Sequence, residues 1–290
     1  MMNNLRIVRT QNALREALQD VRRSGQKIGF VPTMGALHKG HVSLLHEARR
    51  VSDFVVASIF VNPTQFAPGE DLDTYPRPEQ DDLEALASAG CDLAYLPEVA
   101  QMYPDGSRTD VRVAGLSDLL DGVYRPHFFY GVTTVVARLF VHVGPDLAVF
   151  GEKDFQQLQI IRRMVLDLGF PVEIIGAPTI RETDGLASSS RNLYLTPSER
   201  AQAWQLSAAL HRATRRLAVG QTVKVALDEA HALVSQSGFD KVDYISVVDP
   251  ETLEDCADGV LDPGQEVRLL GAAWMGKTRL IDNLRATRTL

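Results

Sequence analysis

The chain has 290 residues, of which 45% are apolar and 23% are charged. This composition is typical of a folded globular protein with one large domain or two ordinary ones. The formal net charge of −7 argues against a general nucleic-acid binder, which would need a basic face, but it allows a local basic pocket for a small anion.

The cysteines and the apolar runs indicate the cellular compartment. Cys91 and Cys256 lie far apart and form no CxxC pair, so the sequence supports neither a disulfide framework nor a cysteine zinc site. Arg6 and Arg9 interrupt any apolar N-terminal stretch, and no run approaches the roughly 18 apolar residues of a membrane span. We therefore expect a cytoplasmic protein.

Strands and helices alternate in the first 180 residues or so. Apolar and β-branched runs predict strands over residues 28–31, 54–61, 92–96, 147–150 and 172–175. Apolar residues at helical spacing predict helices over residues 42–51, 78–89, 133–142 and 155–168. Because strands separated by helices pair in parallel, we expect a layered α/β fold with a parallel sheet.

The pattern changes after about residue 180. Thr196, Pro197 and Glu199 occupy the N-cap, N1 and N3 positions of a strong helix start. We predict helices over residues 196–218 and 223–235, followed by strands over residues 242–248 and 267–274. This order predicts a separate, smaller α+β domain, so the predicted domains are residues 1–182 and 183–290.

The segment from residue 31 to residue 41 carries the strongest functional signal. Two histidines, His38 and His41, lie beside Gly35 and Gly40 where a strand is followed by a helix. Such a helix start favours a bound phosphate, and histidines there can stabilise charge that develops as a phosphoryl bond breaks. Helix capping is the plainer alternative, and a zinc pair without a nearby third ligand is weakly supported.

Two amide side chains, Asn62 and Gln65, follow the second predicted strand. Ligands bind beyond the carboxyl ends of strands in open α/β sheets, and neutral amides suit a small polar substrate with hydroxyl and carboxylate groups. An ordinary Asn-Pro turn is the alternative. The composition of residues 67–77, with Pro, Gly and Asp, predicts a mobile flap.

A second strand–glycine–helix junction covers residues 150–157. Lys153 can bind phosphates as a compact point charge, and Asp154 can hold Mg²⁺ together with phosphate oxygens. A solvated first helical turn is the alternative, although a lysine there opposes the helix dipole. Further along, residues 179–182 and 188–192 combine hydroxyls with arginine, which fits a phosphate clamp, a lid or hinge, or a simple connector.

These four segments, in this order, resemble the pantothenate synthetase (pantoate–β-alanine ligase) family over nearly the whole chain. Residues 32–41 are also similar to the HIGH motif of class I aminoacyl-tRNA synthetases, which alone indicates only an adenylate-forming superfamily of nucleotidyltransferases. The more specific segments are FVNPTQF at residues 60–66, GEKDFQQ at residues 151–157 and SSRN at residues 189–192.

The resemblance implies a Rossmann-like parallel-sheet N-terminal domain, a smaller α+β C-terminal lid domain and a homodimer. It implies ATP and Mg²⁺, with pantoate and β-alanine as the other small-molecule substrates and neither nucleic acid nor a membrane as a partner. Pantoate would attack the α-phosphorus of ATP, releasing diphosphate and leaving enzyme-bound pantoyl adenylate. The β-alanine amine would then displace AMP to give pantothenate, a step towards coenzyme A.

The resemblance also implies roles for matching positions. His41 is the implied proton donor, with His38 as its partner at the phosphates and Lys153 as the third catalytic residue. Gln65, Gln157 and Asn62 would contact pantoate or β-alanine, and Asp154 would be a metal ligand. The implied ATP-binding residues are Met34, Gly35, Ala36, Leu37, His38, Lys39, Gly40, His41, Gly151, Glu152, Lys153, Asp154, Ile180, Ser188, Ser189, Ser190 and Arg191.

One segment departs from the family pattern. The family usually reads Arg-Pro-Gly-His-Phe-x-Gly-Val in the middle of the chain, whereas residues 125–132 read RPHFFYGV. His127 therefore occupies the glycine position and Phe128 the histidine position, so no role of that histidine is transferred.

Two other function classes fit part of the pattern. Another nucleotidyltransferase would use a phosphorylated acceptor, which calls for more cationic side chains than Gln65 and Gln157 provide. A non-catalytic ATP sensor would keep the glycines but would not need both histidines and Lys153. Diphosphate release that depends on pantoate and requires β-alanine would separate the ligase from both.

Overall fold

The computed structural model describes residues 5–67, 70 and 72–289, and their contacts divide them into two compact units. The N-terminal unit takes the described residues of Met1–Asp118 together with Arg125–Glu152 and Gln157–Pro178. The C-terminal unit takes those of Thr179–Leu290 together with Leu119–Tyr124 and Lys153–Gln156. Two short segments that precede Thr179 in the sequence therefore group with the C-terminal unit.

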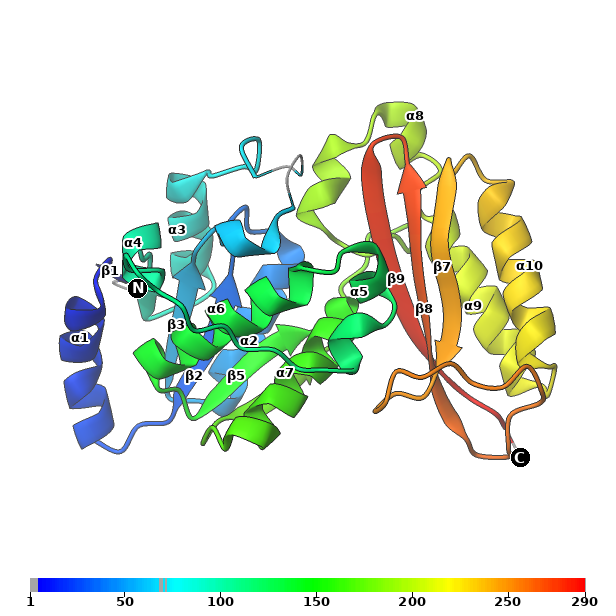
Figure 1. The fold of residues 1–290 in the computed structure, drawn as a ribbon. Helices are drawn as coiled ribbons and strands as arrows, with labels where there is room; N and C mark the ends of the chain where they lie inside the picture. The colour runs from blue at the N-terminus through cyan, green and yellow to red at the C-terminus, as the bar shows by residue number, and fades with distance from the viewer. Residues whose placement is uncertain (1–4, 68–69, 71, 290) are drawn as a thin grey trace. The chain divides into compact units, whose positions relative to one another are not determined.

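The N-terminal unit contains a six-stranded sheet in the order β1-β4-β3-β2-β5-β6, and every neighbouring pair is parallel (Figure 1). The strands are β1 Arg6–Val8, β2 Ile28–Thr33, β3 Phe54–Ile59, β4 Leu93–Tyr95, β5 Leu147–Gly151 and β6 Glu173–Ala177. The chain moves outward from β2 to β3 and β4, and then returns to pair β5 with the other side of β2. This places a switch point between β2 and β5, where open α/β sheets bind ligands.

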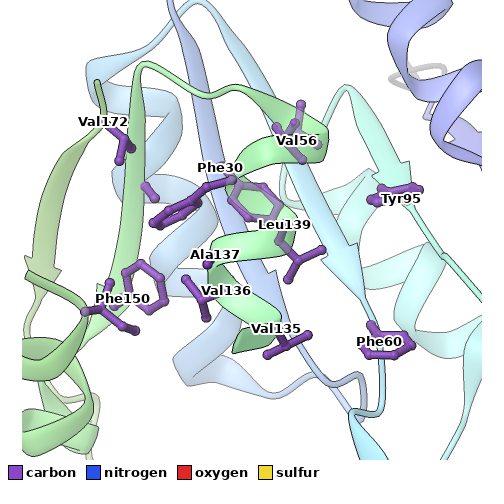
Figure 2. Packing of buried hydrophobic residues seen from close by; sticks show 14 of the residues in the cluster. Phe30, Val56, Phe60, Tyr95, Val135, Val136, Ala137, Leu139, Phe150 and Val172 are labelled. Carbon is purple, nitrogen blue, oxygen red and sulfur yellow. The ribbon is translucent and has the colours of Figure 1, made fainter. Parts of the chain in front are cut away.

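Helices cover both faces of this sheet because successive strand residues point to opposite faces. Phe30 of β2 packs with Phe140 of α6, whereas its neighbour Val31 packs with Leu45 of α2. Figure 2 shows Phe30 and Phe150 close to Val136 of α6 in the first of these two clusters. The helices are α1 Gln11–Arg23, α2 Lys39–Val51, α3 Glu79–Ser88, α4 Val99–Met102, α6 Phe128–Val143 and α7 Phe155–Leu168.

The C-terminal unit has its own sheet and core. Its antiparallel strands are β7 Lys241–Val248, β8 Glu266–Met275 and β9 Thr278–Thr287, in that spatial order. Helices α9 Gln205–Ala218 and α10 Val223–Ser235 bury Leu210 and Val234 against Val247 and Leu269 of the sheet. The short helices α5 Asp121–Tyr124 and α8 Pro197–Arg200 complete the unit. The predicted parallel α/β part and the smaller α+β part are thus confirmed.

The helix predicted over residues 196–218 is wrong in one respect, because it is two helices. Its start is confirmed, since Thr196 Oγ1 accepts the N–H of Glu199 and the Glu199 carboxylate accepts the N–H of Thr196. The indole N–H of Trp204 donates to the carbonyl of Ala201 at 3.1 Å, and a continuous helix would offer that carbonyl to residue 205. The chain therefore turns between α8 and α9.

Other boundaries differ from the predictions by a few residues. Helix α2 begins at Lys39 rather than at residue 42, and α6 begins at Phe128 rather than at residue 133. Strands β1 and β9 and helix α1 were not predicted. None of the helices in the described part of the chain is both long and apolar enough to cross a membrane.

Candidate functional site

The turn between β2 and α2 is held by a buried carboxylate. Gly35 and Ala36 both have left-handed backbones, with φ of 81° and 51°, and this conformation costs a non-glycine residue about 1–2 kcal/mol. Asp82 of α3 is only 2% exposed, and its two oxygens accept the N–H of Ala36 at 2.9 Å and of Leu37 at 2.7 Å. Burial raises the pKa of the Asp82 carboxyl, while these two hydrogen bonds lower it. Asp82 lies outside every motif that the sequence shows and was not predicted.

The two histidines cap α2 and are thereby fixed. Nδ1 of His38 accepts the N–H of Gly40 at 3.1 Å, and Nδ1 of His41 accepts the N–H of His38 at 3.4 Å. Their ring centroids are 4.2 Å apart. Since both Nδ1 atoms act as acceptors, each neutral ring carries its proton on Nε2 and is a hydrogen-bond donor there. Capping and a functional role are therefore compatible.

The amide pair beyond β3 forms one hydrogen-bonded cluster. Asn62 is 1% exposed; its Nδ2 donates to Gln65 Oε1 and to the carbonyl of Gly131, both at 3.1 Å. Its Oδ1 accepts the Tyr103 hydroxyl at 2.7 Å. Gln65 Nε2 in turn lies 2.8 Å from the sulfur of Met34, so the structure brings two predicted binding segments together. Asn62 uses its polar atoms on the protein and orients Gln65.

The backbone of this cluster is packed closely by α6. The cluster's turn, η1 Pro63–Gln65, follows Asn62 and lies directly against Gly131. A Cβ atom at Gly131 would lie 2.6 Å from the carbonyl oxygen of Thr64 and 2.7 Å from the nitrogen of Gln65. Only glycine fits this approach of two backbones.

Arg125 supports the same turn from the segment that departs from the family pattern. Its guanidinium donates to the carbonyl of Gln65 at 3.3 Å and to the Glu70 carboxylate at 2.7 and 2.9 Å. It lies 3.8 Å from the ring centroid of Phe128, a cation–π distance. Phe128 thus holds Arg125, and the neighbouring His127 is exposed at the start of α6. Residues 68, 69 and 71 of the predicted flap lie outside the described residues.

The segment after β5 forms the 3₁₀ turn η3 Glu152–Asp154 before α7. The Lys153 side chain is 17% exposed, which is more buried than expected for a first-turn lysine, and its Nζ lies 3.8 Å from the Asp154 carboxylate. Gln156 is buried and donates to the carbonyl of Leu119 at 2.8 Å, so it has a structural role. Its neighbour Gln157, the predicted substrate ligand, is only partly buried.

The carboxylates of the described residues bear on a possible Mg²⁺ site. Within residues 5–67, 70 and 72–289, no three His, Cys, Asp or Glu side chains are arranged to hold a metal ion. The Asp154 side chain is 47% exposed and can add one carboxylate to an ion whose other ligands are phosphate oxygens and water. The Asp154 carboxylate therefore fits Mg²⁺ that binds together with a nucleotide.

The serine-rich segment is folded on itself. Ser188 is 4% exposed; its hydroxyl donates to the Glu182 carboxylate at 2.7 Å and its N–H to the carbonyl of Ile180 at 2.9 Å. Ser189 accepts the N–H of Arg191 at 3.3 Å and begins the turn η4 Ser190–Tyr194. A structureless connector would lack these contacts, so the plain-connector alternative is not supported.

The predicted residues are divided between the two units. The N-terminal unit holds residues 34–41, Asn62, Gln65, Gly151, Glu152 and Gln157, and the C-terminal unit holds Lys153, Asp154, Ile180 and residues 188–191. Of the predicted ATP-binding residues, Lys39 alone is exposed. The rest are buried or partly buried.

Known proteins resemble this chain along nearly its whole length. The family whose profile matches is described as pantoate-beta-alanine ligase, with residues 6–285 matched. A pantothenate synthetase from Hyphomonas neptunium is 60% identical over 287 residues, which are 99% of this chain and 98% of that protein. One from Caulobacter vibrioides is 50% identical over 278 residues, with 96% and 97% covered.

Solved structures agree in fold. The crystal structure of pantothenate synthetase from Thermus thermophilus has a TM-score of 0.90 at 48% identity, covering 96% of this chain and 98% of that one. The pantoate-beta-alanine ligase from Francisella tularensis, solved in complex with beta-gamma ATP and beta-alanine, has a TM-score of 0.79 at 35% identity, covering 97% of each chain. The similarity therefore includes both units.

Proposed function

The chain belongs to the pantoate–β-alanine ligase family, and from this premise we propose which of its residues carry the reaction. The enzyme is an AMP-forming acid–amine ligase. It condenses pantoate with β-alanine at the expense of ATP, giving pantothenate, AMP and diphosphate through pantoyl adenylate. The observation that carries this conclusion is the family match along residues 6–285, which contains all four predicted segments.

We propose that residues 34–41 bind ATP, with His41 as the proton donor and His38 as its partner. The fixed Nε2 donors at the start of α2 support this role, because the helix dipole and both donors favour negative charge. Negative charge accumulates on the oxygens of the α-phosphate as the pantoate carboxylate attacks, and preorganised donors stabilise it without rearranging. Asp82 keeps the backbone of this segment in position.

Gln65 and Gln157 are proposed to hold pantoate, with Asn62 assisting, at the site for pantoate and β-alanine. Their neutral amides can orient the hydroxyl and carboxylate groups of pantoate, and they carry no positive charge that would favour a phosphorylated substrate. The contacts of Asn62 support an indirect role, since it accepts from Tyr103 and donates to Gln65. Holding both reactants makes the second step effectively unimolecular.

The remaining ATP-binding residues are proposed to be Gly151, Glu152, Lys153, Asp154, Ile180, Ser188, Ser189, Ser190 and Arg191. Lys153 and Arg191 supply positive charge for phosphate oxygens. Mg²⁺, when bound with ATP near Asp154, would neutralise part of the phosphate charge. Residues 1–182 are proposed as the catalytic domain and residues 183–290 as a lid domain that protects the adenylate from water.

A cytoplasmic homodimer is also proposed. Strand β6 ends its sheet, and Leu166 and Leu168 near it are 71% and 55% exposed, which are features that a second copy covers in many oligomers. Both cysteines are free thiols, as a reducing compartment favours. Sedimentation of the protein and of Leu166→Glu tests the dimer: a monomeric wild type would contradict it.

Diphosphate release tests the reaction and Lys153 together. With Mg²⁺, ATP and pantoate, we expect one diphosphate per site without β-alanine and continuous turnover with it; sustained turnover without the amine would contradict the ligase. Lys153→Ala should slow adenylate formation by about 10²–10³-fold, the usual effect of losing one charge-stabilising group. Lys224→Ala, at a lysine whose side chain is 64% exposed, is the control and should not change the rate.

A further inference from the structure

We propose that Asn283 of β9 is a positioning residue for Lys153, and that its neighbour Asp282 supports the Ser188–Arg191 loop through Arg181. The proposal rests on the phosphate-binding roles of Lys153 and Arg191 given above. Asn283 and Asp282 lie more than a hundred residues from Lys153 and Arg181 in the sequence, and neither belongs to a motif.

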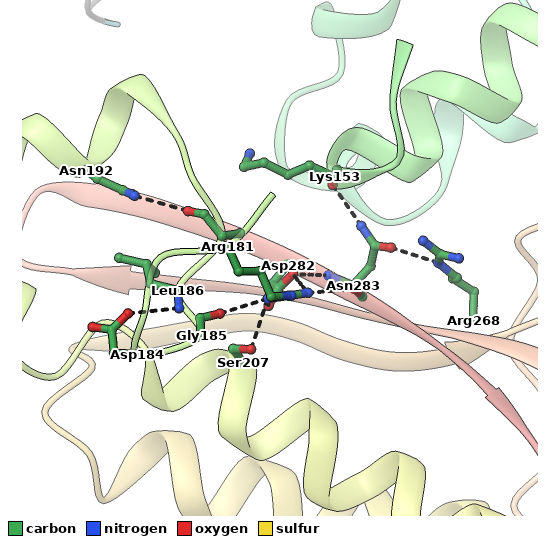
Figure 3. Close-up of polar contacts among 11 residues, drawn as sticks. Lys153, Arg181, Asp184, Gly185, Leu186, Asn192, Ser207, Arg268, Asp282 and Asn283 are labelled. Atoms are coloured by element: carbon green, nitrogen blue, oxygen red, sulfur yellow. Dashed lines mark hydrogen bonds and ion pairs between the residues drawn. The ribbon is translucent and has the colours of Figure 1, made fainter. Parts of the chain in front are cut away.

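Asn283 connects the C-terminal sheet to the backbone of Lys153 (Figure 3). The side chain is 2% exposed; its Nδ2 donates to the Lys153 carbonyl at 2.8 Å, and its Oδ1 accepts Nε of Arg268 at 2.7 Å. Asparagine can donate to a carbonyl and accept from a guanidinium at the same time, whereas aspartate can only accept. The chemistry of the position therefore requires an amide.

Arg268 provides a second attachment for the same segment. It is 8% exposed, and its guanidinium lies 4.1 Å from the ring centroid of Phe155, two residues after Lys153. The ring face attracts the guanidinium electrostatically, and burial strengthens this attraction. Together, Asn283 and Arg268 hold both ends of the Lys153–Phe155 stretch against the sheet.

The adjacent residue, Asp282, serves the opposite face of β9, as alternation along a strand requires. It is 5% exposed and accepts two hydrogen bonds from Arg181, at 2.7 and 2.9 Å. Arg181 also donates to Ser207 of α9 and to the carbonyl of Gly185, both at 3.0 Å. This fixes the base of the loop that continues to Ser188 and Arg191.

Two consecutive residues of one strand thus hold both proposed phosphate-binding segments of the C-terminal unit. Buried ion pairs and amides are a poor way to gain stability, because apolar residues of the same size avoid the loss of hydration. They fix geometry instead. A displacement of about 1 Å at a reacting group can cost about 100-fold in rate, so the positions of Lys153 and Arg191 matter more than the stability gained.

The test variant is Asn283→Asp, which keeps the size of the side chain and the bond from Arg268. It replaces the donor to Lys153 with an oxygen facing the carbonyl oxygen, so we expect adenylate formation to fall by about 10- to 100-fold. Affinity for ATP, measured by calorimetry, should fall while affinity for pantoate stays unchanged; general destabilisation would reduce both. Thr278→Val, at another buried position of β9, is the control.

A double variant with Lys153→Ala decides the mechanism. If Asn283 acts through Lys153, the double variant is no slower than Lys153→Ala alone. If the rate losses of the two single variants multiply in the double variant, or if Asn283→Asp has the wild-type rate, the inference is overturned while the proposed role of Lys153 stays intact. An unimpaired Lys153→Ala would instead overturn that role and the inference with it. Asn283→Ser, which adds no charge, takes the place of Asn283→Asp if the latter does not fold, with the same outcomes.

Discussion

A single methyl group at Gly131 is expected to displace the amides of Asn62 and Gln65, which are proposed to bind substrate. Gly131 lies inside α6, where alanine ordinarily stabilises a helix by about 0.5–1 kcal/mol. Here the new Cβ would lie 2.6 Å from the carbonyl oxygen of Thr64 and 2.7 Å from the nitrogen of Gln65. Both are backbone atoms, so neither can rotate away as a flexible side chain would.

The size of the displacement follows from these distances. Ordinary contacts of a Cβ begin at 3.4 Å, so α6 and η1 must separate by about 0.8 Å, the difference from 2.6 Å. The hydrogen bond from Asn62 to the Gly131 carbonyl stretches with them, and Asn62 passes the shift to Gln65. Overpacking costs about 1–3 kcal/mol, and a shift near 1 Å costs up to about 100-fold in rate.

We therefore expect Gly131→Ala to reduce the free energy of unfolding by about 1–2 kcal/mol and kcat/KM for pantoate by about 10- to 100-fold. Urea denaturation and steady-state kinetics with varied pantoate at saturating ATP measure the two effects. Gly259→Ala is the control, since its Cβ would meet nothing within 4 Å. Wild-type kcat/KM for pantoate in Gly131→Ala, or a change confined to the KM for ATP, would refute the reasoning.

Two further sites give predictions of the same kind. Asp82→Asn leaves the N–H of Ala36 or Leu37 without its acceptor, so it should lower the free energy of unfolding by about 1–3 kcal/mol and slow adenylate formation. Asp81→Asn, at an exposed neighbour, is the control and should change neither quantity. Equal effects of the two substitutions would contradict this role of Asp82. Burial raises the pKa of the Asp82 carboxyl in the folded protein above its usual 3.8. The free energy of unfolding of the wild type, relative to Asp82→Asn, should therefore fall as pH rises from about 4 through the folded pKa. An increase over this pH range would contradict the raised pKa. Burial raises the pKa of the Cys91 thiol to about 12, so about one thiol in 10⁴ is ionised at pH 8, and mass spectrometry should find Cys91 alkylated by iodoacetamide only after unfolding.

The alternation of strands and helices could be predicted because both faces of a parallel sheet are buried. Strands such as β2 and β5 are short apolar runs between helices, and the sequence shows this directly. Strand β9 could not be found in this way. Asp282 and Asn283 occupy buried positions in it, and their partners Arg181 and Lys153 are distant in sequence.

The same distinction between local and distant sequence signals applies to the residues of the candidate site. The histidines at the start of α2 could be recognised, because motif residues and the helix start are adjacent in the sequence. Asp82 could not, since it binds backbone N–H groups of Ala36 and Leu37, which any residues except proline would supply. An acidic residue in the first turns of α3 also has an ordinary explanation in the helix dipole.

The long separation in sequence between β9 and the residues that it holds has a consequence for synthesis on the ribosome. Lys153 is made 130 residues before the Asn283 that holds it, and Arg181 is made 101 residues before Asp282. A nascent chain that stops short of β9 already contains both histidines and Gln65, yet it lacks the supports of Lys153 and of the serine loop. On the proposed roles, the ability to use ATP therefore does not mature until β9 has been made.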